Sequence, residues 1–112
     1  MHRIPLRQLT VLAVACFAAG SALAQDAEFR LTLQSHRFDP AELTVPAGQK
    51  LKLVIDNRDA TPEEFESKDL RREKPIPANG TATMPVGPLK PGRYAFFGEF
   101  NPKTAQGVLI AK

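Results

Sequence analysis

The chain has 112 residues, of which 43% are hydrophobic and 24% charged, so it is long enough for one domain with a modest core. Its 15 basic and 12 acidic residues give a formal net charge of +3, and Arg3 and Arg7 near the N-terminus account for two of these charges. The remaining balance of 13 − 12 = +1 indicates neither a nucleic-acid partner nor a membrane-surface partner.

The first 24 residues have the pattern of a secretory signal peptide. Two arginines and no acid precede an apolar run from Leu9 to Gly20, which is too short to cross a bilayer as a stable helix, and Ala22-Leu23-Ala24 provides a small-residue cleavage site. We therefore expect cleavage before Gln25, export to the periplasm and a single mature domain at residues 25–112. Because Cys16 lies inside the apolar run, a lipoprotein signal is an alternative, although the three residues before it make a poor lipobox.

Seven short segments of the mature chain alternate apolar and polar residues between turns rich in proline, glycine and asparagine. They run from Glu28 to Leu33, Glu42 to Val45, Lys50 to Asp56, Pro75 to Pro77, Thr81 to Met84, Arg93 to Phe97 and Val108 to Ala111. In the third segment Leu51, Leu53 and Ile55 fall on one face. The pattern predicts an all-β fold of the sandwich type.

One further segment fits two structures. Thr61-Pro62-Glu63-Glu64 has the residues of a capping box and could open a helix through about Arg72. The apolar residues of that helix, Phe65 and Leu70, would be five positions apart and would form no stripe. We therefore predict an extended segment from Glu63 to Ser67, followed by one helical turn.

The landmarks of the mature chain come in a recognisable order. Phe38-Asp39-Pro40 is followed by Leu43-Thr44-Val45-Pro46-Ala47-Gly48, Asn57-Arg58-Asp59-Ala60-Thr61-Pro62, Leu89-Lys90-Pro91-Gly92-Arg93-Tyr94-Ala95-Phe96-Phe97 and Gly107-Val108-Leu109-Ile110. This order resembles the small periplasmic cupredoxin-like domains of the EfeO type over nearly all of the mature chain. The resemblance implies a Greek-key β-sandwich of the cupredoxin type with about seven strands.

Blue-copper members of the wider fold carry their ligands at positions that correspond here to Glu63, Gly98, Asn101 and Thr104. A type 1 copper centre requires a thiolate, two imidazoles and usually a weak thioether ligand. Cleavage of the signal peptide would remove the one cysteine of the chain and leave a single histidine, His36. We therefore exclude a type 1 copper centre.

The resemblance also implies an accessory role in the uptake of ferrous iron. The pattern of residues 61–67 together with residues 96–107 is similar to a subgroup associated with ferrous-iron uptake systems. Those systems combine a periplasmic metal-binding protein, a cupredoxin-like protein and an FTR-type inner-membrane permease, and the first and third of these would be the partners. Copper or iron would be the bound ion. Enzymatic oxidation of ferrous iron with the help of copper is left open.

In the fold that the resemblance implies, the loop after Asn57 and the loop after Phe97 meet at one end of the sandwich. This brings four glutamates into one neighbourhood, and carboxylates suit hard cations and accept copper(II) where an imidazole helps. The candidate metal ligands are Glu63, Glu64, Glu66 and Glu99, with His36 as a nitrogen ligand and Asn101 as a polar group behind the ligands.

The alternation of an extended segment divides these candidates between two faces. Glu64 and Glu66 would share one face, while Glu63 and the core residue Phe65 would share the other. The alternation therefore allows two separate sites: an inner one that uses Glu63 and Glu99, and an outer one that uses Glu64 and Glu66.

Two other readings of the same residues stay open. The glutamates could form a solvated surface patch that Lys68, Arg71 and Arg72 screen. The domain could also be a metal-free module that docks a permease or a periplasmic partner through Arg71, Arg72 and Lys74. Met84 is expected to pack in the core rather than to bind a metal.

Overall fold

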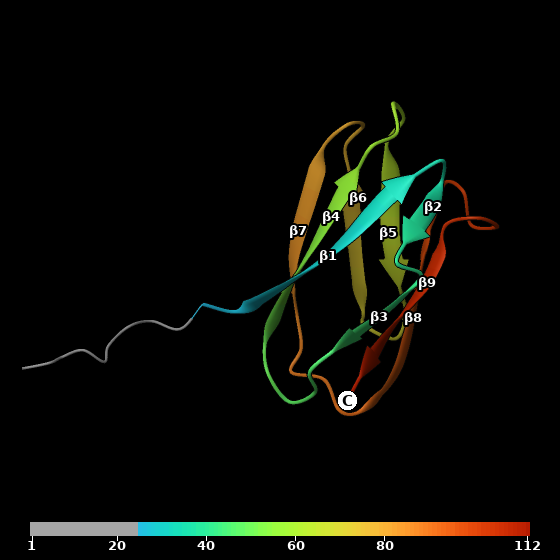
Figure 1. Cartoon of the computed structure of the whole chain (residues 1–112). Helices are drawn as coiled ribbons and strands as arrows, with labels where there is room; N and C mark the ends of the chain where they lie inside the picture. Colours follow the sequence, from blue (N-terminus) through green and yellow to red (C-terminus); the bar gives the residue numbers. More distant parts are fainter. Residues whose placement is uncertain (1–24) are drawn as a thin grey trace, which may run out of the picture.

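Residues 25–112 of the computed structural model form two β-sheets packed face to face (Figure 1). The strands in chain order are β1 (Ala27–Gln34), β2 (Arg37–Asp39), β3 (Glu42–Val45), β4 (Leu51–Asn57), β5 (Glu63–Ser67), β6 (Arg72–Ile76), β7 (Thr81–Val86), β8 (Gly92–Gly98) and β9 (Gln106–Ala111). The structure describes these residues only, so the predicted signal peptide at residues 1–24 lies outside the described part of the chain.

One sheet has the strand order β2-β1-β4-β7 and the other the order β3-β9-β8-β5-β6. Both sheets are mixed, because β1 runs parallel to β4 and β3 runs parallel to β9, while the other neighbours are antiparallel. The predicted all-β sandwich is confirmed. Within residues 25–112 no helix has the length and apolar character needed to span a membrane.

The structure has nine strands where about seven were predicted. The strand β2 has three residues, too few to show an alternating pattern. The strand β5 coincides with the segment that we predicted to be extended, so the helical alternative was wrong. The single helical turn expected after it is replaced by a hydrogen-bonded turn, in which the N–H of Arg71 donates to the carbonyl of Lys68 over 3.1 Å.

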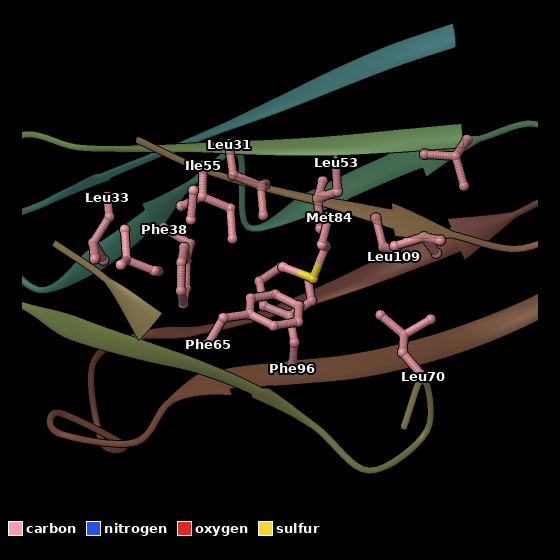
Figure 2. Close-up of a cluster of buried hydrophobic side chains, with 14 of the residues drawn as sticks. Leu31, Leu33, Phe38, Leu53, Ile55, Phe65, Leu70, Met84, Phe96 and Leu109 are labelled. Carbon is pink, nitrogen blue, oxygen red and sulfur yellow. The ribbon is translucent and has the colours of Figure 1, made fainter. Parts of the chain in front are cut away.

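The core lies between the sheets and is built from the inward faces of the alternating strands. Leu51, Leu53 and Ile55 of β4 are all 0% exposed, as their shared face predicts. Burial of each such side chain stabilises the fold by about 1.5–3 kcal/mol. Met84 of β7 is also buried and belongs to the same cluster, in agreement with its predicted role in the core (Figure 2).

Three aromatic side chains join the two layers (Figure 2). The rings of Phe65 and Phe96 are stacked with centroids 5.1 Å apart, and the ring of Phe38 meets Phe96 edge-on at the same separation. Because Phe65 points inward, the residues on either side of it, Glu64 and Glu66, point to the outer face of the five-stranded sheet. The packing of one aromatic side chain thus fixes the direction of the acidic ones.

Candidate metal centre

The beginning of β5 and the end of β8 lie together at the pole toward which the arrowheads of β1 and β4 point (Figure 1). Phe65 is paired with Gly98, and the N–H of Glu99 donates to the carbonyl of Glu64 over 2.8 Å. The loop after β8 folds back on itself, since the N–H of Gly98 donates to the carbonyl of Ala105 over 2.8 Å. The structure therefore brings together the two segments that carry the predicted glutamates.

Three of these glutamates converge on the outer face. One carboxylate oxygen from each of Glu64, Glu66 and Glu99 lies within 4.8 Å of the other two. Glu64 and Glu66 are partly buried and Glu99 is exposed. Atom Oε2 of Glu66 is shielded from solvent and has no hydrogen-bond donor in the described part of the chain. A group of this kind suits a hard cation, which would supply the missing partner of that oxygen.

The cluster also carries uncompensated negative charge. Burial raises the pKa of Glu66 above its ordinary value, and the neighbouring carboxylates of Glu73, Glu99 and Glu64 raise it further. Glu73 lies directly opposite Glu66 on the adjacent strand β6. None of the ion pairs among residues 25–112 involves any of these four carboxylates.

The basic residues that were expected to screen the patch lie beside it without pairing with it. Lys68, Arg71 and Arg72 line a hollow together with Glu66 and Glu73, but none of them comes within 4.0 Å of a carboxylate oxygen there. The guanidinium of Arg72 instead donates to the carbonyl of Pro85 on β7 over 3.1 Å. Their charges can screen the cluster only through solvent.

Glu63 lies on the opposite face of β5 and is 2% exposed. Its Oε1 accepts hydrogen bonds from the N–H of Glu64 over 2.9 Å and from the N–H of Phe100 over 2.7 Å. Its Oε2 accepts one from the side-chain amide of Asn101 over 2.9 Å. The structure thus pairs Glu63 with Asn101 inside the pole and Glu99 with Glu64 and Glu66 outside it.

The outward direction of Glu99 could have been read from the sequence. The alternation of β8 places Phe96 and Gly98 inward and Phe97 outward. Glu99, the residue after Gly98, is therefore expected to point outward like Phe97. The neighbour Glu73, by contrast, carries no such signal, because its position opposite Glu66 depends on the register set by the turn between β5 and β6. Sequence reasoning missed it.

His36 belongs to a separate network at the same pole. It occupies the two-residue turn between β1 and β2 with Ser35, and both residues have positive φ angles, 56° and 53°. The carboxylate of Asp59 accepts the N–H of Ser35 over 2.7 Å and that of His36 over 2.9 Å, and Nδ1 of His36 lies 3.5 Å from Oδ2 of Asp59. His36 is not a member of the outer carboxylate group.

The residues at the pole do not fit a type 1 copper ion. Neither Gly98 nor Glu63 offers the thiolate or imidazole that such a centre requires. A Cβ atom added to Gly98 would lie 2.6 Å from Cδ of Glu63 and 2.8 Å from Cβ of Ala105. The fourth corresponding residue, Thr104, is exposed, and its hydroxyl lies 3.5 Å from the carbonyl of Asn101. The side chain of Glu63 thus occupies the volume into which a side chain at position 98 would extend.

The chain belongs to the family of cupredoxin-like domains, whose family model matches residues 8–111. Among curated proteins, it is 45% identical over 83 residues to an uncharacterized protein, RP394, of Rickettsia prowazekii (strain Madrid E). The match covers 74% of this chain and 66% of that protein, so the chain spans just under two thirds of the relative's length.

Solved structures of cupredoxins have the same fold. Auracyanin A, a blue copper protein from Chloroflexus aurantiacus, superposes with a TM-score of 0.66 at 15% identity and covers 79% of this chain and 100% of its own. The metal-binding domain of the Cu(I)-exporting P-type ATPase CopA of Streptococcus pneumoniae D39, solved with Cu(I), gives a TM-score of 0.65 at 16% identity over 81% of this chain and 91% of its own. The predicted cupredoxin type of the sandwich is thereby confirmed.

Proposed function

We propose that this protein is a periplasmic cupredoxin-like accessory protein that binds a transition metal, copper or iron, through carboxylates and assists iron uptake. The observation that carries the proposal is that one carboxylate oxygen from each of Glu64, Glu66 and Glu99 lies within 4.8 Å of the other two. The shielded Oε2 of Glu66 accepts no hydrogen bond from the described part of the chain. Carboxylate oxygens without counterions attract hard cations. An ion of the transition series is supported by two structural neighbours, auracyanin A, which is a blue copper protein, and the metal-binding domain of CopA, which was solved with Cu(I).

The wider setting of the proposal comes from the resemblance to EfeO-type domains. The partners would be a periplasmic metal-binding protein and an FTR-type permease, to which the domain would present or from which it would receive the ion. The outer cluster lies at the surface of the sheet, which suits an ion that is passed on rather than stored. Its oxygen ligands also favour weak, exchangeable binding of iron(II) over the tight binding that thiolates give.

The ligand set can be tested by NMR with manganese(II) as a paramagnetic probe that prefers oxygen ligands. We expect manganese(II), iron(II) and copper(II) to perturb the amides of Glu64, Glu66 and Glu99 in the native protein. The triple variant Glu64→Gln/Glu66→Gln/Glu99→Gln keeps the shape of each side chain but loses its charge, and it should show no site-specific broadening. Equal broadening in the triple variant would contradict the proposal.

A second function, a metal-free module that docks a permease or a periplasmic partner, is favoured by one observation. Phe100 is 58% exposed and is the one large hydrophobic side chain of residues 25–112 at the surface to this degree. It directly follows Glu99, so an apolar and an acidic group stand together at the pole. Co-purification of a partner that Phe100→Ser abolishes, with no metal-induced change in the NMR spectrum, would favour this function over the first.

A further inference from the structure

The most completely buried carboxylate at the pole is outside the proposed ligand group. Glu63 is 2% exposed, and a buried charged group is costly unless its oxygens are paired. The side chain of Glu63 is the acceptor in all three of its hydrogen bonds, and the donors are two backbone N–H groups and one side-chain amide. An ionised carboxylate is an acceptor only, so this set of partners matches it in kind and leaves little room for a metal.

The two backbone donors are the groups next to the proposed ligands. One is the N–H of Glu64 itself, and the other is the N–H of Phe100, which directly follows Glu99. A direct hydrogen bond also joins the two ligand residues, from the N–H of Glu99 to the carbonyl of Glu64 over 2.8 Å. The carboxylate of Glu63 therefore ties together, from the inside, the two backbone segments whose side chains converge outside.

The absence of a side chain at Gly98 is part of the same arrangement. A Cβ atom at that position would lie 2.6 Å from Cδ and 2.7 Å from Oε2 of Glu63. A real Cβ atom essentially never comes this close to a non-bonded atom, so a side chain at position 98 and the present position of the Glu63 carboxylate exclude each other. Asn101 then closes the other side of the carboxylate through its amide.

We infer that Glu63 is a positioning residue and not a metal ligand: its buried carboxylate takes the place of an ion inside the pole and sets the spacing of the outer carboxylates Glu64 and Glu99. The inference rests on the proposed function for the metal that these outer residues would bind. Its structural part, the bond between Glu63 and Asn101 that holds the loop after β8, stands independently of any metal.

The test exchanges the donor and the acceptor of that bond. Asn101→Asp places two carboxylates against each other where the native groups are 2.9 Å apart. The double variant Glu63→Gln/Asn101→Asp restores one donor and one acceptor and has the same net charge as the native protein. The two readouts are the chemical shift of the Phe100 amide, which reports the 2.7 Å bond to Glu63, and the affinity for manganese(II) measured by broadening at residues 64, 66 and 99.

We expect Asn101→Asp to shift the Phe100 amide upfield and to weaken manganese(II) binding by about tenfold or more, as loss of a group that orients ligands commonly does. This loss would occur although the variant carries one more negative charge, which by electrostatics alone would strengthen cation binding. The double variant should recover both readouts. A ligand role for Glu63 predicts the opposite, because glutamine is a poor replacement for a ligating carboxylate.

The outcomes that overturn the inference are distinct from those that overturn the proposed function. A double variant that binds manganese(II) as weakly as Asn101→Asp, or a Phe100 amide that Asn101→Asp leaves unmoved, would show that Glu63 does not position the loop. If the native protein binds no manganese(II), the proposed function fails. The Phe100 amide in the single and double variants then still decides the inference.

Discussion

Glu66 is the residue of the outer cluster whose negative charge is disfavoured both by burial and by neighbouring carboxylates. Its burial and the carboxylates of Glu73, Glu99 and Glu64 raise its pKa above the ordinary value of 4.5, so the folded protein holds this proton more tightly than the unfolded chain. The stability that the protonated group contributes is fully present below pH 4.5 and is lost as the pH rises through the raised pKa.

This predicts a pH-dependent effect of Glu66→Gln. The variant should gain stability relative to the native protein as the pH rises from about 4 toward neutrality, because glutamine does not ionise and is not repelled by the neighbouring carboxylates. Urea unfolding at a series of pH values, followed by circular dichroism, measures the difference. Asp26→Asn, which changes an exposed carboxylate that takes part in none of the ion pairs among residues 25–112, is the control and should show no such trend. A constant difference between Glu66→Gln and the native protein would contradict the prediction.

At the scale of secondary-structure elements, the hairpin of β1 and β2 depends on a residue from elsewhere in the chain. A two-residue turn with positive φ at both positions favours asparagine and glycine, but here it contains Ser35 and His36. Their N–H groups both donate to the carboxylate of Asp59, which has an exposed side-chain fraction of 16%. The turn is therefore stabilised by tertiary contacts rather than by its own sequence.

Replacement of Asp59 should accordingly loosen the β1–β2 hairpin. Asp59→Ala removes one charged acceptor from two N–H groups, and we expect a loss of about 1–3 kcal/mol in the free energy of unfolding. Hydrogen exchange of the Ser35 and His36 amides should accelerate in the same variant. Ser35→Asn/His36→Gly, which suits the turn type, should make the protein less sensitive to Asp59→Ala. An unchanged midpoint of unfolding in Asp59→Ala would show that the turn needs no such support.

The sequence predicted those elements whose pattern is local. The strand β4 follows from the alternation of Leu51, Leu53 and Ile55, and β5 follows from the absence of a helical stripe around Phe65. Contacts that depend on strand register could not be predicted from the sequence. No periodicity relates Glu73 to Glu66, which lies opposite it, or relates Asp59 to the β1–β2 turn, whose N–H groups donate to the Asp59 carboxylate. The alternation of β5 did separate Glu63 from Glu64 and Glu66, but Glu99 was predicted as the inner partner of Glu63, whereas the structure places it with the outer group.

At the scale of the whole molecule, an ion at the outer cluster would join two strands of one sheet in the folded state only. Glu64 and Glu66 lie on β5 and Glu99 follows β8, so unfolding would separate the ligands. A ligand that binds only the folded protein stabilises it by about 2.7 kcal/mol at a concentration one hundred times its Kd. Binding of metal should therefore be visible as a rise in Tm.

We expect the Tm of the native protein to increase with manganese(II) concentration, and to increase more at pH 7 than at pH 5, because protons compete with the ion for the cluster. Scanning calorimetry of the native protein and of Glu64→Gln/Glu66→Gln/Glu99→Gln provides the comparison. An equal rise in both proteins would mean that the ion acts through another part of the surface.

The mutual exclusion of Glu63 and a side chain at position 98 has a consequence for the evolution of such domains. A cysteine introduced at position 98 would collide with the glutamate, and a histidine introduced at position 63 would strip three donors of their acceptor. Each single step lowers stability, although the two together could begin a thiolate site. Passage between this chain and a copper-binding ancestor or descendant would therefore require room at position 98 against both Glu63 and Ala105, whose Cβ would lie 2.8 Å from the new Cβ atom, so more than one position would have to change.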